Sequence, residues 1–215
     1  MGSERSLFEV GCGGGKYLVM FGLKGWKCVG LDCSREVLQR AERYIEEVKN
    51  KCDGGIDIRL VRADFLEYIM EGSSSFDIVF NAGVIEHFLD ETERLEFLKK
   101  KFELAKPGGY VISIIPNGMH YRREKVRGDN LGGYHIPEIN FSPALIEGEM
   151  DRCGGRDIKV IPHNIFGYLR FDGVVSLPKI LRVFLYYLAQ LAPDFIWPRK
   201  FALRHSLTLI GIARK

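Results

Sequence analysis

Three acidic side chains stand at points where the sequence predicts that buried strands end. Glu9 lies inside an apolar run directly before the glycine-rich stretch G-C-G-G-G-K, and Asp32 and Asp64 each follow a further apolar run. The carboxyl ends of parallel strands meet at one edge of an open α/β sheet, and ligands bind at that edge. We therefore expect the glycines and the three carboxylates to form one ligand site.

The acid in the first run indicates the kind of ligand. A carboxylate beside a pyrophosphate would meet like-charge repulsion, and Lys16 occupies the third glycine position of the dinucleotide pattern G-x-G-x-x-G. S-adenosylmethionine has a sulfonium and an ammonium and no phosphate, so we expect Glu9 to attract its ammonium. Asp32 is placed to accept hydrogen bonds from the ribose hydroxyls. Asp64 can accept from the adenine amino group, with Phe65 beside the ring, or can instead cap a helix.

The elements that must position these residues alternate between strands and helices. Apolar runs predict strands over 7–10, 27–31, 58–61, 76–81, 110–115, 158–162 and 207–213. Ser34 and Ser142 are good N-caps for two helices, and a third helix is expected over 91–104. Alternation of this kind predicts an α/β fold with parallel strands and right-handed crossovers.

Five motifs in order resemble the class I S-adenosylmethionine-dependent methyltransferases. They are E-V-G-C-G-G-G, G-L-D-C-S, R-A-D-F, F-D-I-V-F-N-A-G-V-I-E-H-F and K-P-G-G-Y-V-I-S-I-I-P-N, and together they cover residues 7–117. The V-I-E-H-F stretch is most similar to the branch that methylates small molecules and quinones. No N-P-P-Y-like tetrapeptide is present, because Asn81 is followed by Ala82 and Gly83, which disfavours methylation of nucleic-acid bases.

The resemblance implies a Rossmann-like, doubly wound sheet of seven strands, mostly parallel with an antiparallel last strand, and a helical insertion precedes that strand. We expect a single domain over 1–215, with a cofactor-binding half over 1–117 and a substrate-side half over 118–215. The residues implied to bind S-adenosylmethionine, and S-adenosylhomocysteine as product, are Glu9, Gly11, Cys12, Gly13, Asp32, Cys33, Asp64, Phe65, Asn81, Ala82 and His87. No metal is expected.

The family normally carries one or two helices before the first strand that close over the cofactor. Only 1–6 precede the first strand here, so either the sequence begins late or another element supplies this cover. The insertion or a second subunit could do so.

Methyl transfer from a sulfonium depends mainly on positioning, so a strong acid or base is not obligatory. A hydroxyl acceptor would benefit from a general base, and His87, His120 and His135 are the candidates. Tyr134 and His135 lie in the segment where the family usually contacts its acceptor. We expect O-methylation of a small or lipid-like molecule. The alternatives are an NAD(P)-dependent oxidoreductase and a non-catalytic, methyltransferase-like binding or assembly subunit.

Composition limits the classes of molecule that the chain is expected to bind. The chain has 215 residues, a formal charge of +3 and no long basic block, so nucleic-acid binding is not indicated. The five cysteines form no CxxC pair, and no signal peptide precedes them, which is typical of reduced thiols in a cytoplasmic protein without structural zinc.

The most unusual segment is the apolar insertion over about 166–201. Its uncharged run, 183–192, is too short to span a bilayer, which needs about 20 residues. Basic and aromatic residues flank the run, so a peripheral membrane contact through 176–200 or a lipid-accepting pocket is one interpretation. A buried lid helix or a homodimer interface is the other.

Overall fold

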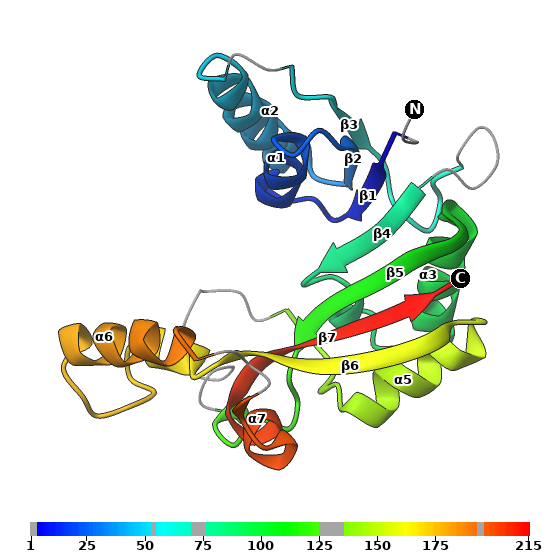
Figure 1. Ribbon diagram of the computed structural model, residues 1–215. Helices are drawn as coiled ribbons and strands as arrows, with labels where there is room; N and C mark the ends of the chain where they lie inside the picture. Colours follow the sequence, from blue (N-terminus) through cyan, green and yellow to red (C-terminus); the bar gives the residue numbers. More distant parts are fainter. Residues whose placement is uncertain (1–3, 53–54, 70–75, 125–135, 193–195) are drawn as a thin grey trace.

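The computed structural model describes residues 4–52, 55–69, 76–124, 136–192 and 196–215. Its strands are β1 (Ser6–Val10), β2 (Lys27–Asp32), β3 (Ile58–Arg62), β4 (Phe76–Ala82), β5 (Ala105–Pro116), β6 (Arg156–Ile165) and β7 (Ser206–Arg214). They form one seven-stranded sheet in the order β3-β2-β1-β4-β5-β7-β6 (Figure 1). β7 runs antiparallel to both of its neighbours, and the other described pairs are parallel, which confirms the predicted topology.

The helices lie on both faces of this sheet. They are α1 (Lys16–Gly22), α2 (Arg35–Lys49), α3 (Glu91–Leu104), α5 (Pro143–Arg152), α6 (Lys179–Gln190) and α7 (Arg199–His205), with short 3₁₀ turns η1 (Ile85–His87) and η2 (Gly167–Arg170). α1 and α2 cover one face near β2 and β3, while α3 and α5 cover the other face (Figure 1). This is the doubly wound arrangement expected of an alternating chain.

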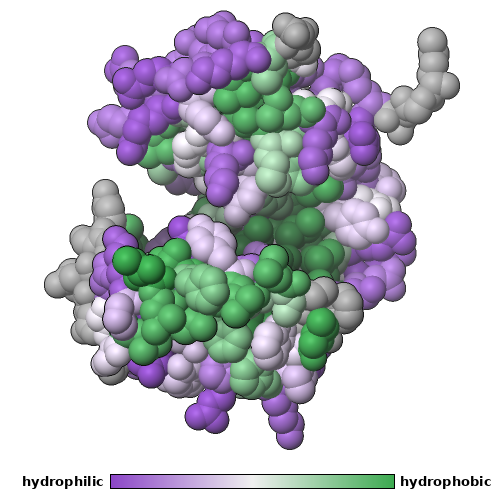
Figure 2. Space-filling view, turned by 60° about the vertical axis from the view of Figure 1, so that its left-hand side comes forward, coloured by the Kyte–Doolittle hydropathy of each residue, from purple (hydrophilic) through white to green (hydrophobic). Residues whose placement is uncertain are grey.

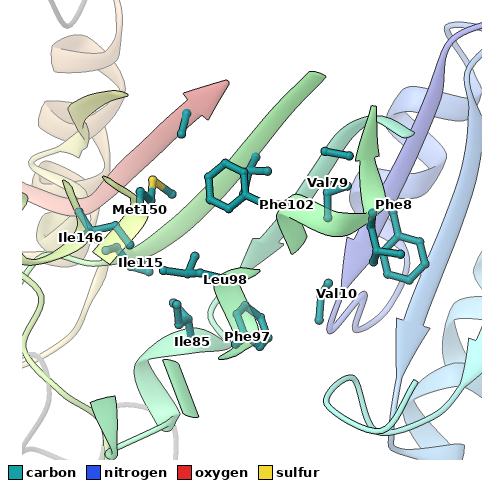
Figure 3. Close-up of a cluster of buried hydrophobic side chains, with 14 of the residues drawn as sticks. Phe8, Val10, Val79, Ile85, Phe97, Leu98, Phe102, Ile115, Ile146 and Met150 are labelled. Carbon is teal, nitrogen blue, oxygen red and sulfur yellow. The ribbon is translucent and has the colours of Figure 1, made fainter. Parts of the chain in front are cut away.

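The main core lies between the sheet and the helices α3 and α5 (Figure 3). Phe8 and Val10 point from β1 toward Phe97 of α3, whereas Leu7 packs with the α1 and α2 side chains on the opposite face. Successive strand residues point to opposite faces, and both faces of a parallel sheet are buried. For this reason the strands read as continuous apolar runs.

Helix starts follow the predicted capping residues. The Ser34 side chain accepts a hydrogen bond from the Val37 amide, and Ser142 accepts from Leu145 with a proline at the first helical position. Asp90 accepts from two amides at the start of α3. Side-chain oxygens at these positions satisfy amides that have no partner inside the helix.

β5 begins earlier than the sequence analysis expected. Lys106, Pro107, Gly108 and Gly109 belong to this strand, because Ala105 already pairs with Phe76 before a register shift in the ladder. The K-P-G-G motif is therefore an irregular strand entry and not a separate turn.

A buried ion pair joins the two helices on the α3 face. Arg94 Nε donates to Glu149 Oε1 over 2.9 Å, and both side chains are almost fully buried. Arg94 Nη1 also donates to the carbonyls of Phe88 and Leu89, just beyond η1. Arg94 thus connects α3, α5 and the chain that follows η1.

The insertion between β6 and β7 forms η2, α6 and α7. Its helix α6 packs on η2 and β6, and Figure 1 places it away from α1 and β1. The described part of the insertion therefore lies away from the first glycine turn, and which element covers the cofactor stays open between the alternatives named above. None of the helices in the described part of the chain combines the length and apolar character needed to cross a bilayer.

Candidate functional site

The predicted site lies at the carboxyl edge of the sheet, where the turn after β1 meets the end of β2. Gly11 has a φ of 68°, and a Cβ there would lie 2.4 Å from Val84 Cγ2, so no other residue fits without movement. The amides of Gly11 and Cys12 both donate to the Leu31 carbonyl. This turn is therefore fixed against β2 and against the segment after β4.

Asp32 holds the same turn from the end of β2. Its Oδ2 accepts from the Gly13 amide over 3.1 Å, and its Oδ1 accepts from the Ser34 amide over 2.9 Å. Each carboxylate oxygen keeps a further lone pair that can accept a hydroxyl. Asp32 is thus both a support of the turn and a possible acceptor for a ligand diol. The sequence analysis predicted only the second role.

Glu9 is the most unusual group of the site. The side chain is 2% exposed, and its Oε2 has no hydrogen-bond partner among the described residues. Burial, and then the nearby charge of Asp32, raise the pKa of Glu9 to about 9. A buried carboxyl without a partner is costly, and a cation placed beside it would remove that cost.

These residues fit S-adenosylmethionine. Glu9 offers an unpaired buried oxygen to an ammonium, Asp32 offers acceptors to a ribose, and the Gly13 position is open, since a Cβ there would meet nothing within 4 Å. When bound, the cofactor supplies an electrophilic methyl group on its sulfonium. A dinucleotide would instead bring its phosphates toward two acidic side chains.

The third-strand residues behave differently from expectation. Asp64 is exposed, and its Oδ1 accepts from the Leu66 amide over 2.8 Å, so it caps a turn and not a helix, and its contact with adenine stays a prediction. The ring of Phe65 is buried in the core against Phe97, with ring centroids 4.9 Å apart. Its side chain therefore does not line the ligand site, because the core takes its apolar surface.

Asn81 at the end of β4 also faces inward. Its Oδ1 accepts from Lys101 Nζ over 2.6 Å and from Ser113 Oγ over 2.9 Å, all three side chains being buried. Burial lowers the pKa of Lys101 well below its usual value. The Asn81 side chain thus joins β4, β5 and α3, and its contact with the cofactor stays a prediction. The half-buried Ala82 follows it at the strand end.

The two cysteines assigned to the site differ in burial. Cys12 is buried on the α1 face, and burial raises the pKa of its thiol to about 12. Its side chain is core, so only its backbone can contribute to the site. Cys33 is exposed directly after β2. All five cysteines are free thiols, as predicted.

His87 lies in η1 with two carboxylates beside it. Its Nδ1 is 3.2 Å from the Pro137 carbonyl oxygen, which can only accept, so Nδ1 donates this hydrogen bond and Nε2 is the ring nitrogen left for another partner. Side-chain ligand atoms of Glu86, His87 and Glu138 lie within 4.8 Å of one another. Glu86 is 2% exposed with a partnerless Oε2 among the described residues, and Glu138 pairs with Arg123.

Tyr134 and His135 lie outside the described residues.

An aromatic cluster was missed by the sequence analysis. Tyr121 Oη donates to Tyr168 Oη over 3.1 Å, and the His120 and His205 rings pack against the same tyrosines. The cluster borders a surface pocket of about 510 Å³ lined by residues 118 and 120–124. Burial lowers the pKa of His120 to about 4, so this histidine is neutral at physiological pH. Its members come from three distant segments, so no local pattern could reveal it.

Comparisons with known proteins agree with this fold. Residues 8–113 match the model of the methyltransferase domain family. Ubiquinone biosynthesis O-methyltransferase of Caulobacter vibrioides is 32% identical over 165 residues, which are 66% of this chain and 60% of that protein. The chain spans 54–60% of the length of the first curated relatives that it matches.

Solved structures share the fold. A S-adenosylmethionine-dependent methyltransferase from Archaeoglobus fulgidus superposes with a TM-score of 0.66 and 18% identity, covering 99% of this chain and 87% of that one. Phosphoethanolamine N-methyltransferase 2 of Haemonchus contortus, solved with S-adenosylmethionine, has a TM-score of 0.64 and 20% identity. The match covers 100% of this chain and 49% of that one.

The fold and the glycine turn between two acidic strand ends define a class of α/β proteins that bind an adenosine-containing ligand. Within that class, residues 8–113 match the methyltransferase domain family, and together with the relatives and solved structures they identify a class I S-adenosylmethionine-dependent methyltransferase. The relative and the two solved structures named above are methyltransferases by name.

Replacing Asp32 by alanine is expected to weaken S-adenosylmethionine binding by about 1.5–3 kcal/mol, because acceptors for the ribose and for the Gly13 amide disappear together. Titration calorimetry measures this loss. Glu47→Ala, on the exposed side of α2, is the matched control and should bind normally. Unchanged affinity in a folded Asp32→Ala protein would remove Asp32 from the site.

Proposed function

We propose that this chain transfers the methyl group of S-adenosylmethionine to a hydroxyl group of a small, lipid-like acceptor. The observation that carries the cofactor part is Glu9, whose buried oxygen has no partner among the described residues and stands beside Asp32. The feature that favours a hydroxyl is His87, whose Nδ1 donates to the Pro137 carbonyl and whose Nε2 is the candidate proton acceptor.

The proposed mechanism assigns binding and proton transfer to different residues. Glu9 and Asp32 fix the position of the cofactor at the ends of β1 and β2. The acceptor hydroxyl would give its proton to Nε2 of His87 as its oxygen bonds to the methyl carbon, while the bond from that carbon to the sulfonium sulfur would break and leave S-adenosylhomocysteine. Glu86 and Glu138 lie close enough to stabilise the imidazolium that forms.

The shape of the molecule supports an apolar acceptor. Figure 2 shows a hollow between the part that carries α1 and α2 and the part that carries α6, with apolar residues on its floor and along its lower rim. Relatives named ubiquinone biosynthesis O-methyltransferases support the same substrate class. A partly apolar cleft with a few convergent polar groups is typical of small-molecule sites.

His87→Ala tests the proposal. We expect kcat to fall about 100- to 10,000-fold with little change in S-adenosylmethionine affinity, since a general base acts on the acceptor and not on the cofactor. The assay compares a phenol that carries a long apolar tail with the tail-free phenol. His163→Ala, a histidine on β6, is the matched control and should keep wild-type turnover.

Other outcomes separate the alternatives. Methylation that survives in His87→Ala at the wild-type rate would overturn the general base. Activity that EDTA abolishes and Mg²⁺ restores would assign Glu86, His87 and Glu138 to a metal ion instead. Tight cofactor binding without turnover on hydroxyl, amine or carbon acceptors would favour the non-catalytic subunit.

A further inference from the structure

Helix α6 exposes the apolar side of its surface. Ile180, Phe184, Tyr187, Leu188 and Leu191 follow the spacing of one helix face, with exposed fractions from 52% to 86%. Figure 2 shows this apolar patch over α6 on the face turned toward the viewer. Large apolar patches on a protein surface mark contacts with partners or membranes. The sequence alternative of a buried lid helix is therefore wrong for the described chain.

The opposite side of α6 is firmly attached. Arg182 is buried and donates to the carbonyls of Leu169, Phe171 and Leu177, and it also pairs with Asp172. Tyr186 Oη donates to Asn164 Oδ1, and Gln190 Nε2 donates to the Ile165 carbonyl.

These contacts fix which face of the helix meets solvent. Because Arg182 satisfies three carbonyls at once, a rotation of α6 that buried Ile180 or Phe184 would leave those carbonyls without a donor. The exposed apolar face is thus a stable feature of the fold, and something outside the described chain must cover it to lower its cost.

The charges around α6 indicate the chemical nature of the partner that covers its apolar face. Helix α6 itself contains no aspartate or glutamate, the exposed Asp172 before it pairs with Arg182, and Lys179 begins the helix and is exposed. The guanidinium of Arg170 lies 5.4 Å from the ring centre of Tyr186, next to the helix. An apolar face bordered by cations and lacking acids matches an anionic lipid surface, where side chains enter the interface and cations meet headgroups.

The position of α6 agrees with this partner. β6 runs parallel to β1 and β4, so its carboxyl end, from which η2 and α6 follow, lies at the same edge as Glu9 and Asp32. Figure 2 places the apolar patch directly below the hollow between the two parts of the molecule. A surface that covers α6 would therefore face the entrance of that hollow.

We propose that α6 docks this chain on an anionic lipid bilayer, lying in the interface with Ile180, Phe184 and Leu191 inserted and Lys179 and Arg170 beside the headgroups. The binding is peripheral and electrostatically assisted, so it weakens as salt screens the cations. It does not depend on the acceptor or on methyl transfer.

The test is co-sedimentation of the full chain with phosphatidylcholine vesicles that contain phosphatidylglycerol, at low and at high salt. We expect binding to the mixed vesicles, weaker binding at high salt, and little binding to pure phosphatidylcholine. Ile180→Glu/Phe184→Glu should lose at least tenfold in affinity, because two inserted apolar side chains become charged.

Leu23→Glu, an exposed leucine at the end of α1, is the matched control and should bind as the wild type does. Thermal melts show whether both variants remain folded, and turnover of a tail-free acceptor separates a docking defect from a catalytic one. Absence of vesicle binding by the wild type would overturn the proposal. So would a wild-type dimer in sedimentation velocity that Ile180→Glu/Phe184→Glu converts to monomer, since the cover would then be a second copy.

Discussion

Glu9→Gln is expected to make the fold more stable at neutral pH and to weaken S-adenosylmethionine binding. The wild-type carboxyl has a pKa of about 9 in the folded chain against an ordinary value of 4.5. A carboxyl whose pKa is raised on folding stabilises the folded state only while it keeps its proton. This contribution to stability is complete below pH 4.5 and is lost as the pH rises through 9. Glutamine does not ionise, so the Glu9→Gln protein does not lose this stability.

The size of this effect follows from the pKa difference. Urea unfolding should show a stability difference between Glu9→Gln and wild type that is small near pH 5. The difference should grow by about 1 kcal/mol for each pH unit up to pH 8. A pH-independent difference would mean that Glu9 does not titrate in this range.

Cofactor binding gives a second readout of the same residue. An ammonium placed beside Glu9 favours the ionised carboxylate, so wild-type binding at pH 7 should release about one proton. Calorimetry in buffers of different ionisation enthalpy counts this proton. Glu9→Gln should release none and bind at least tenfold more weakly. Proton-neutral binding by the wild type would separate Glu9 from the ammonium.

Arg94→Met is expected to destabilise the chain by about 3–5 kcal/mol. The change leaves the fully buried Glu149 without its partner, and removing one member of a buried pair costs far more than the pair itself contributes. It also removes the donor to the carbonyls of Phe88 and Leu89. Urea or thermal unfolding measures the loss.

Two further variants identify the cause. Arg94→Met/Glu149→Met should recover most of the loss, since no buried charge remains. Arg152→Met breaks the exposed pair with Glu91 and should cost less than about 1 kcal/mol. A loss under about 1 kcal/mol for Arg94→Met itself would show that water reaches Glu149.

Local rules were sufficient for the scaffold. Alternating apolar runs and capping residues such as Ser34 and Ser142 predicted the helices and the strand positions, because both depend on neighbours in the chain. The burial of Glu9 was also predictable, since an acid inside an apolar strand must be buried with it. The motif resemblance added the antiparallel last strand, which no local pattern specifies.

Several site assignments required the tertiary structure. Asn81 lies near the end of β4 and Phe65 in the turn after β3, and both side chains are turned toward α3. A shift of one residue along a strand changes the face that a side chain meets, and sequence does not show this near a strand end. The aromatic cluster around Tyr168 joins segments far apart in the chain and was invisible for the same reason.

The sequence by itself determined the α/β fold, the glycine turn and the two acidic strand ends at Glu9 and Asp32, because each depends on residue type and spacing along one or two strands. Only the tertiary structure decided that α6 turns its apolar face outward. That outcome depends on Arg182, which satisfies carbonyls of three residues on the other side of the helix. The apolar residues of α6 are evident from the sequence, whereas the hydrogen bonds of Arg182 decide which face of the helix is exposed.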